Sequence, residues 1–250
     1  MKKLFFILLL FGSVRFLQAQ DVNSINTTMT NFRLSMLPEV ATFEAIARYY
    51  DGNPFLEDEW LPGRVAMVSG QVLEYPMKYF VYADQILLKN EQDSIRSLNL
   101  SEQVRNVKIG DRIFVYDEYY WGSKIKKGIL ELLYRGTFGN VFLLHTCKIE
   151  KGREANGYQE REKDAFRQQH TLYYNIEDAE ITALPRTKKD FFRVFGGHAA
   201  NVERFCKENK LKINQEDVAR IFTYYDELKK EENQKLALML EQNNSNKMSL

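Results

Sequence analysis

Ten short segments rich in Val, Ile, Tyr and Phe follow one another between Arg64 and Leu184, separated by Gly, Asp and Asn. Runs of this composition that end at turn residues are typical of β-strands. Most of the connections are short, which favours antiparallel neighbours, because parallel strands need a long crossover. The sequence therefore predicts a body of antiparallel strands over residues 63–184, arranged as a meander, a partly open barrel or a sandwich. The segments are RVAMVS, VLEYP, KYFVYA, QILLK, VRNVKI, RIFVYDEYYW, GILELLYRG, NVFLLHTCKI, TLYYNI and AEITAL.

After Pro185 the apolar residues recur at spacings of three and four, the period of an amphipathic helix. Asn214, with Asp217 three residues on, is a candidate N-cap for the last of these helices. Short helices alone bury too little surface, so we expect residues 185–242 to pack on the sheet in an α+β fold. Residues 243–250 are expected to be a disordered tail. The stripe expected to be buried comprises Phe191, Phe192, Phe195, Val202, Phe205, Ile221, Phe222 and Tyr225.

The first 19 residues have the order of a secretory signal peptide. Two lysines precede an apolar run from Leu4 to Phe11, and small and polar residues follow up to Ala19. The apolar run is shorter than the roughly 20 residues that span a bilayer, although a retained membrane anchor is the alternative. We therefore expect cleavage after Ala19 or Gln20, and an exported chain, periplasmic or extracellular, with no transmembrane span after cleavage.

Residues 20–62 are interpreted as a lead-in to the sheet, with a short helical pattern from Pro38 to Tyr50. Near its end Glu57, Asp58 and Glu59 are consecutive. Three adjacent acids could bind calcium, but such a run is more often a solvated loop. The polar stretch 150–169, between two of the expected strands, is interpreted as a surface loop or a short helix.

The charge of the chain is close to balanced. Removal of the first 19 residues takes away Lys2, Lys3 and Arg15, which leaves 32 basic against 34 acidic residues and a net charge of −2. A chain of this charge has no global field to attract polyanions. The densest basic clusters, KIKKG and PRTKKD, are short, so the sequence does not predict a nucleic-acid partner.

The stretch DRIFVYDEYYW, residues 111–121, combines a core pattern with a possible surface. From Ile113 to Tyr116 both faces of the expected strand are apolar, which indicates a strand covered on both sides. Tyr119, Tyr120 and Trp121 then precede Gly122, as at a hairpin tip. They are candidates for a ligand or partner surface, because aromatic side chains offer large contact area. The alternative, which we favour, is that they pack beneath the helices.

The residues that could carry chemistry do not form a recognised motif. His145 and Cys147 alternate on one expected strand and could begin a zinc site, but no further ligand stands at a suitable spacing. Asp117 and Glu118 point to opposite faces, a poor arrangement for paired acid–base catalysis. There is no G-x-S-x-G, P-loop or G-x-G-x-x-G sequence. The sequence therefore predicts no catalytic, cofactor-binding or metal-binding residue.

The chain has two cysteines, Cys147 and Cys206. An oxidising compartment would permit a disulfide between them, but spacing does not show whether they meet. Two buried free thiols are the alternative.

Several stretches in a fixed order resemble secreted and periplasmic β-rich proteins of Bacteroidetes that carry no assigned reaction. They include GNPFLEDEWLPGRVAMVSGQ, MKYFVYADQILLKN, IGDRIFVYDEY and GILELLYRG, and a helical end with the pair Tyr224-Tyr225. The similarity covers about Gly52 to Leu228. It implies a β-rich body, a helical end and an exported or envelope location, and it implies no activity.

These observations favour an exported, non-catalytic binding or structural module of the cell envelope. The expected partner is an envelope protein or an apolar ligand, with no cofactor. The alternative is a carrier that holds an apolar or lipid-like ligand between sheet and helix. An enzyme is the least favoured reading, because few ionisable residues can converge.

Overall fold

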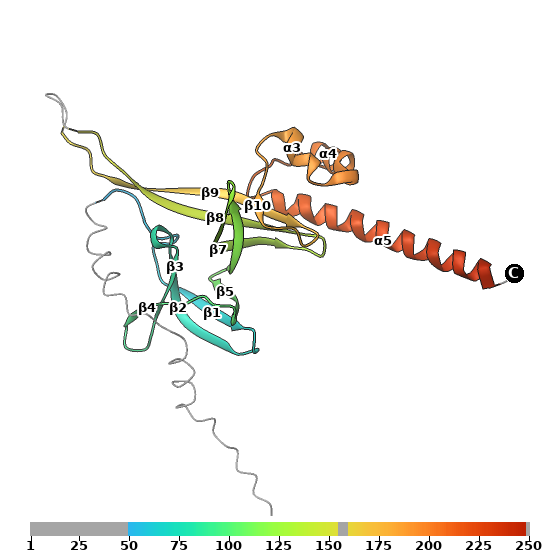
Figure 1. Cartoon of the computed structure of the whole chain (residues 1–250). Helices are drawn as coiled ribbons and strands as arrows, with labels where there is room; N and C mark the ends of the chain where they lie inside the picture. Colours follow the sequence, from blue (N-terminus) through green and yellow to red (C-terminus); the bar gives the residue numbers. More distant parts are fainter. Residues whose placement is uncertain (1–49, 155–159, 249–250) are drawn as a thin grey trace, which may run out of the picture.

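The computed structural model of the chain describes residues 50–154 and 160–248 (Figure 1). The predicted signal peptide and the helical pattern from Pro38 lie outside these residues, except for Tyr50 at its end. Among the described residues, no helix has the length and apolar character needed to cross a bilayer.

The described chain is an α+β protein built on an open antiparallel sheet, followed by helices, as predicted. The strand order is β10-β9-β8-β7-β6-β5-β1-β2-β3-β4. Two meanders, β1–β4 and β5–β10, are therefore joined through the pairing of β1 with β5. The strands are β1 (Leu61–Met67), β2 (Val72–Phe80), β3 (Gln85–Lys89), β4 (Ile95–Ser97), β5 (Val104–Ile109), β6 (Arg112–Trp121), β7 (Lys124–Arg135), β8 (Gly139–Glu150), β9 (Ala165–Ile176) and β10 (Thr182–Ala183). These ten strands are not the ten predicted segments: VLEYP and the first half of KYFVYA form the single strand β2, and the short strand β4 was not predicted.

Strand β9 is longer than the sequence predicts. It begins at Ala165, within the stretch interpreted as a loop or helix, and pairs with β8 along its whole length, from Glu150↔Ala165 to Gly139↔Ile176. In its first half, AFRQQH, the first two residues are buried and most of the others are exposed, so buried and exposed positions do not alternate. Backbone pairing with β8 holds this polar half in the sheet, and a period-2 pattern of apolar residues cannot reveal such pairing.

The sheet buries side chains on both of its faces. Phe114 belongs to a core shared with β1, β2, β3 and β5, whereas its neighbour Val115 belongs to a second core with β8 and β9. Both faces of β6 are therefore covered at these two positions. The prediction that Ile113 and Tyr116 are core is wrong, because these side chains are 36% and 37% exposed. On each face of β6 the covering side chains reach one of two alternate residues and not the other: Val115 is covered but Ile113 is not, and Phe114 is covered but Tyr116 is not.

The helices pack on the sheet as expected. They are α3 (Lys188–Arg193), α4 (Ala199–Glu208) and α5 (Val218–Met248). Their apolar side chains form one cluster with Val141 of β8 and with Leu172 and Tyr174 of β9. Asn214 accepts a hydrogen bond from the Asp217 N–H before α5, in agreement with its predicted capping role. All members of the predicted stripe are buried except Phe205, which is half-buried and stacks on Tyr224 at 4.0 Å.

Helix α5 continues to Met248, beyond residue 242, where the sequence suggests that the helical part ends. No Gly or Pro follows Gly197, and the segment after Leu228 is rich in strong helix formers such as Lys, Glu, Gln, Leu and Ala. In Figure 1 the C-terminal half of α5 extends away from the body, and four of its apolar side chains are exposed: Leu236, Leu238, Met239 and Leu240.

Candidate functional site

The β6–β7 hairpin extends beyond its neighbours in the sheet. The pairing of β6 with β5 ends at Phe114, and the pairing of β7 with β8 begins at Glu131. Residues 115–130 therefore form a two-stranded ribbon, which we call the hairpin ribbon. Its backbone also pairs with the following chain at an isolated bridge to Ile181, whose carbonyl accepts a hydrogen bond from the Tyr120 N–H.

The three aromatic residues proposed as a surface lie in different surroundings. Tyr119 is buried, makes an edge contact with Tyr173 at 5.3 Å, and burial raises the pKa of its hydroxyl to about 12. Tyr120 is half-buried. Trp121 is 43% exposed and lies beneath the ammonium group of Lys126 at 4.6 Å. Our expectation that Trp121 packs beneath the helices is wrong, because the helices cover β8 and β9 instead.

A shallow groove of about 240 Å³ runs beside the hairpin ribbon. Tyr120 and Ile125 are cross-strand partners on its wall, and Ile125 is 59% exposed. The neighbouring pair Glu118 and Lys127 places opposite charges next to these apolar side chains. The groove is lined by Asp117, Glu118, Tyr119, Tyr120, Ile125, Asn175, Ala179, Glu180 and Ile181.

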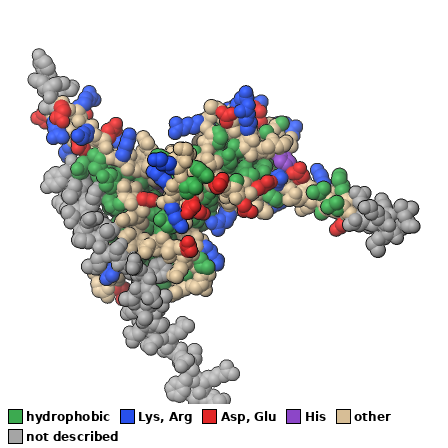
Figure 2. Space-filling view, in the orientation of Figure 1, with side chains coloured by type: hydrophobic (Ala, Val, Ile, Leu, Met, Phe, Trp, Pro, Cys, Tyr) green, Lys and Arg blue, Asp and Glu red, His purple; other side chains and the backbone are tan. Residues whose placement is uncertain are grey.

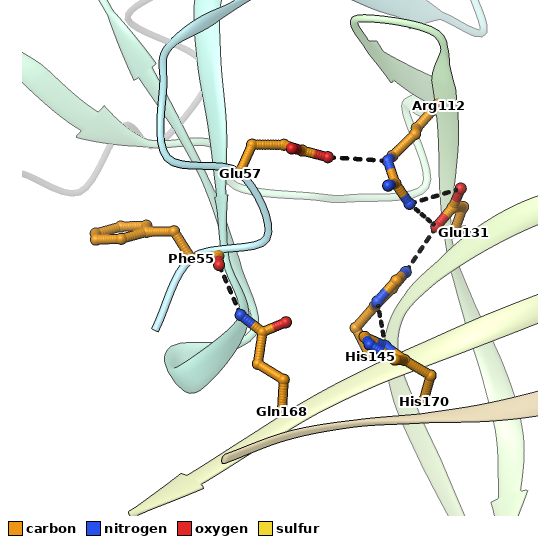
Figure 3. Close-up of polar contacts among 7 residues, drawn as sticks. All are labelled: Phe55, Glu57, Arg112, Glu131, His145, Gln168 and His170. Atoms are coloured by element: carbon orange, nitrogen blue, oxygen red, sulfur yellow. Dashed lines mark hydrogen bonds and ion pairs between the residues drawn. The ribbon is translucent and has the colours of Figure 1, made fainter. Parts of the chain in front are cut away.

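A network of polar side chains crosses four adjacent strands, β6 to β9 (Figure 3). Arg112 of β6 donates from Nη1 to the Glu131 carboxylate of β7 at 3.0 Å, and its Nε lies 3.1 Å from Glu57. His145 of β8 lies with Nε2 2.7 Å from Glu131 Oε2, and its Nδ1 lies 2.9 Å from Nδ1 of His170 in β9. These five residues form one continuous chain of hydrogen bonds and ion pairs, which we call the polar network.

The chemistry of the groups assigns one proton in this network. An ionised carboxylate can only accept, so His145 Nε2–H donates to Glu131. Between the two Nδ1 atoms one imidazole donates and the other accepts. Burial alone would raise the pKa of Glu131, but the hydrogen bond from His145 and the charge of Arg112 outweigh it and hold this pKa below its usual value. The pKa of His170 is lowered by burial and by the nearby His145 and Arg112.

The polar network joins the sheet to the segment that precedes it. Glu57 belongs to that segment, and Gln168 of β9 donates to the carbonyls of Asn53 and Phe55 in the same segment, at 2.9 and 2.7 Å. Glu131 and His145 are both nearly fully buried, so each needs its partners to offset the loss of water. The arrangement therefore orders the segment over the sheet. The acid inside the apolar run GILELLYRG was the signal in the sequence that could have identified Glu131.

The residues weighed for other chemistry do not converge. Cys147 is a free thiol whose pKa is raised by burial, which disfavours its reactive thiolate form. It belongs to the first sheet core, whereas Cys206 lies in the helical cluster. Asp58 of the acidic run accepts a hydrogen bond from Asn53. Within residues 50–154 and 160–248, no group of three or more His, Cys, Asp or Glu side chains is arranged to hold a metal ion.

Comparison of the chain with models of protein families, with curated proteins and with solved structures finds no match.

Proposed function

We propose that the protein is an exported, non-catalytic binding module of the cell envelope that holds a partner protein through the tip of its hairpin ribbon. The observation that carries this proposal is the exposure of Trp121 and Ile125 at the tip of a ribbon that extends beyond the sheet. The signal-peptide order of the first 19 residues and the resemblance to secreted Bacteroidetes proteins support the location.

The hairpin ribbon has the composition of a contact surface. Large aromatic side chains that are partly exposed in the free protein commonly supply most of the binding energy of an interface. Trp121 and Ile125 are largely exposed in the folded chain, so a partner would be needed to bury these side chains further. Lys124, Lys126 and Lys127 surround them. The complementary partner is therefore a protein surface with an apolar pocket bordered by carboxylates.

A carrier function has less support. A ligand held between sheet and helix would occupy the space where Val141, Phe195 and Phe222 lie with at most 2% of their surface exposed. Those side chains already fill that space.

Site-specific photo-cross-linking in the native cells tests the proposal. A photoreactive amino acid at position 121 is expected to give one discrete protein adduct. The same group at Val72, a position of comparable exposure at the start of β2, is the control and should give none. With the identified partner, Trp121→Ala should weaken binding about tenfold or more, whereas Val72→Ala should not. Equal binding by both variants would contradict the proposal.

The non-catalytic part of the proposal has its own test. Single replacement of His145, Cys147 or Glu118 by Ala should leave any hydrolytic activity of the purified protein unchanged. A loss of about a thousandfold from one of them, with folding intact, would show that the protein is an enzyme.

A further inference from the structure

An open groove of about 410 Å³ lies on the helical part of the molecule, between the start of α3 and the end of α4. The sequence does not reveal it, because its walls come from two separate segments, 186–192 and 206–213. Figure 2 shows Lys and Arg side chains gathered on the surface of this part of the molecule. The groove is lined by Arg186, Lys188, Phe192, Cys206, Lys207, Lys210, Leu211, Lys212 and Ile213.

Positive charge at this groove exceeds the negative charge beside it. Lys188 and Lys207 share one carboxylate, Glu203, at 4.0 and 3.3 Å. Arg186, Lys210 and Lys212 form no ion pair with any described residue. Asp217 accepts a hydrogen bond from the backbone N–H of Lys212, and Asp190 of α3 pairs with Arg193, which does not line the groove. The groove lining itself contains five cations and no carboxylate.

Two of these cations occupy positions that do not favour the fold. Lys210 follows α4 with φ 55°, the left-handed conformation that usually ends a helix at Gly or Asn. The helix end is closed there by the hydrogen bond from the Leu211 N–H to the Cys206 carbonyl. Lys188 is the first residue of α3, where the helix dipole disfavours a cation. Residues that cost stability in this way are often kept for a function.

The floor of the groove is apolar. Leu211 and Ile213 are half-buried, and Phe192 and Cys206 lie behind them. Burial raises the pKa of the Cys206 thiol to about 11, so the thiol is neutral and contributes to the apolar floor. The Lys188 ammonium lies 5.9 Å from the centre of the Phe192 ring, which keeps this cation at the rim.

We propose that this groove is a binding site for a phosphate-bearing amphiphile, with the phosphate among the cations and the first methylene groups on the floor. A phosphate monoester carries about two negative charges and three acceptor oxygens, which matches several unpaired cations better than a single carboxylate does. Lysines serve as point charges for phosphate, and an arginine adds directional donors. The ligand is either a free phosphorylated amphiphile or the headgroup of a membrane lipid. The proposal is independent of the hairpin ribbon.

Titration calorimetry with the intact mature protein tests the site with three probes: dispersed dihexanoyl phosphatidic acid, inorganic phosphate, and phosphatidylcholine vesicles doped with phosphatidic acid. The dispersed amphiphile should bind roughly tenfold more tightly than inorganic phosphate, since about two buried methylene groups supply that factor. If the protein binds the vesicles but neither dispersed probe, and the groove variants described below lose this binding, the site is also supported and its ligand is a membrane lipid. Equal affinity for both dispersed probes would contradict the apolar floor.

Two variants and a control connect the binding to the groove. Lys210→Gly removes a cation and also relieves the left-handed backbone, so it should keep or increase stability while it weakens binding about tenfold. Arg186→Gln should weaken binding by a similar factor. Lys148→Gln, at an exposed position on β8, should change nothing. Unchanged binding by both groove variants, or tighter binding of a DNA oligonucleotide than of the amphiphile, would overturn the proposal.

Discussion

Replacement of Phe222 by Ala measures how strongly α5 is attached to the sheet. The Phe222 side chain is fully buried, with ring centres of Phe195 and Tyr174 at 5.2 and 6.2 Å. On the strand side, a Cβ on Gly139 would lie 3.2 Å from the Phe222 ring, so the glycine allows the ring to approach the backbone of β8.

The expected cost follows from this packing. Full burial of a Phe side chain contributes about 1.5–3 kcal/mol by transfer from water. The cavity left by the truncation adds to this cost, because rigid aromatic rings and strand backbone cannot move into it. We therefore expect Phe222→Ala to lower the free energy of unfolding by about 4 kcal/mol, within the usual range of about 3–5 kcal/mol for such changes. Phe205→Ala is the matched control, and we expect about 1–2 kcal/mol because this ring is half-buried.

Urea unfolding followed by two signals is the assay. Both tryptophans, Trp60 and Trp121, lie in the sheet part of the chain, so their fluorescence reports on the sheet, whereas far-ultraviolet circular dichroism reports on the helices. If sheet and helices unfold as one unit, both midpoints shift together. A change below about 1 kcal/mol for Phe222→Ala, or an equal effect of Phe205→Ala, would refute the packing argument.

Three further predictions test other parts of the molecule. Asp226 is 1% exposed and accepts hydrogen bonds from two backbone N–H groups of the β7–β8 turn. Asp226→Ala should therefore lower the free energy of unfolding in urea by about 2–4 kcal/mol, and a loss under about 1 kcal/mol would contradict this role. The pKa of His170 is lowered in the folded chain, so as pH falls the unfolded chain binds the proton first. The free energy of unfolding should therefore decrease as pH falls below about 6.5. The same dependence of this free energy on pH in wild type and His170→Gln would contradict the prediction. N-terminal sequencing of envelope protein should begin at Gln20 or Asp21, and an intact first residue would exclude cleavage.

The sequence alone determined most of the succession of strands and helices, although it did not reveal the three-residue strand β4 and divided β2 into two segments. Short β-rich runs with turn residues between them specify strands locally, and a spacing of three and four specifies an amphipathic helix. The stripe from Phe191 to Tyr225 was predicted for this reason, since one face of a helix is buried wherever that helix packs. The order of strands along most of the sheet also follows from short connections.

Only the tertiary structure decided which faces are covered and which side chains meet. Ile113 and Phe114 have the same local pattern, but one is 36% exposed and the other 1%, because another part of the sheet lies over only one of them. The polar network joins Glu57 to residues of four strands, and the hydrogen bond of Gln168 to Asn53 beside it spans 115 positions of the chain. The five cations of the groove between α3 and α4 come from two separate segments, so only the packing of these helices brings them together. Local sequence fixes backbone period, whereas burial and charge clustering depend on long-range packing, which no local pattern encodes.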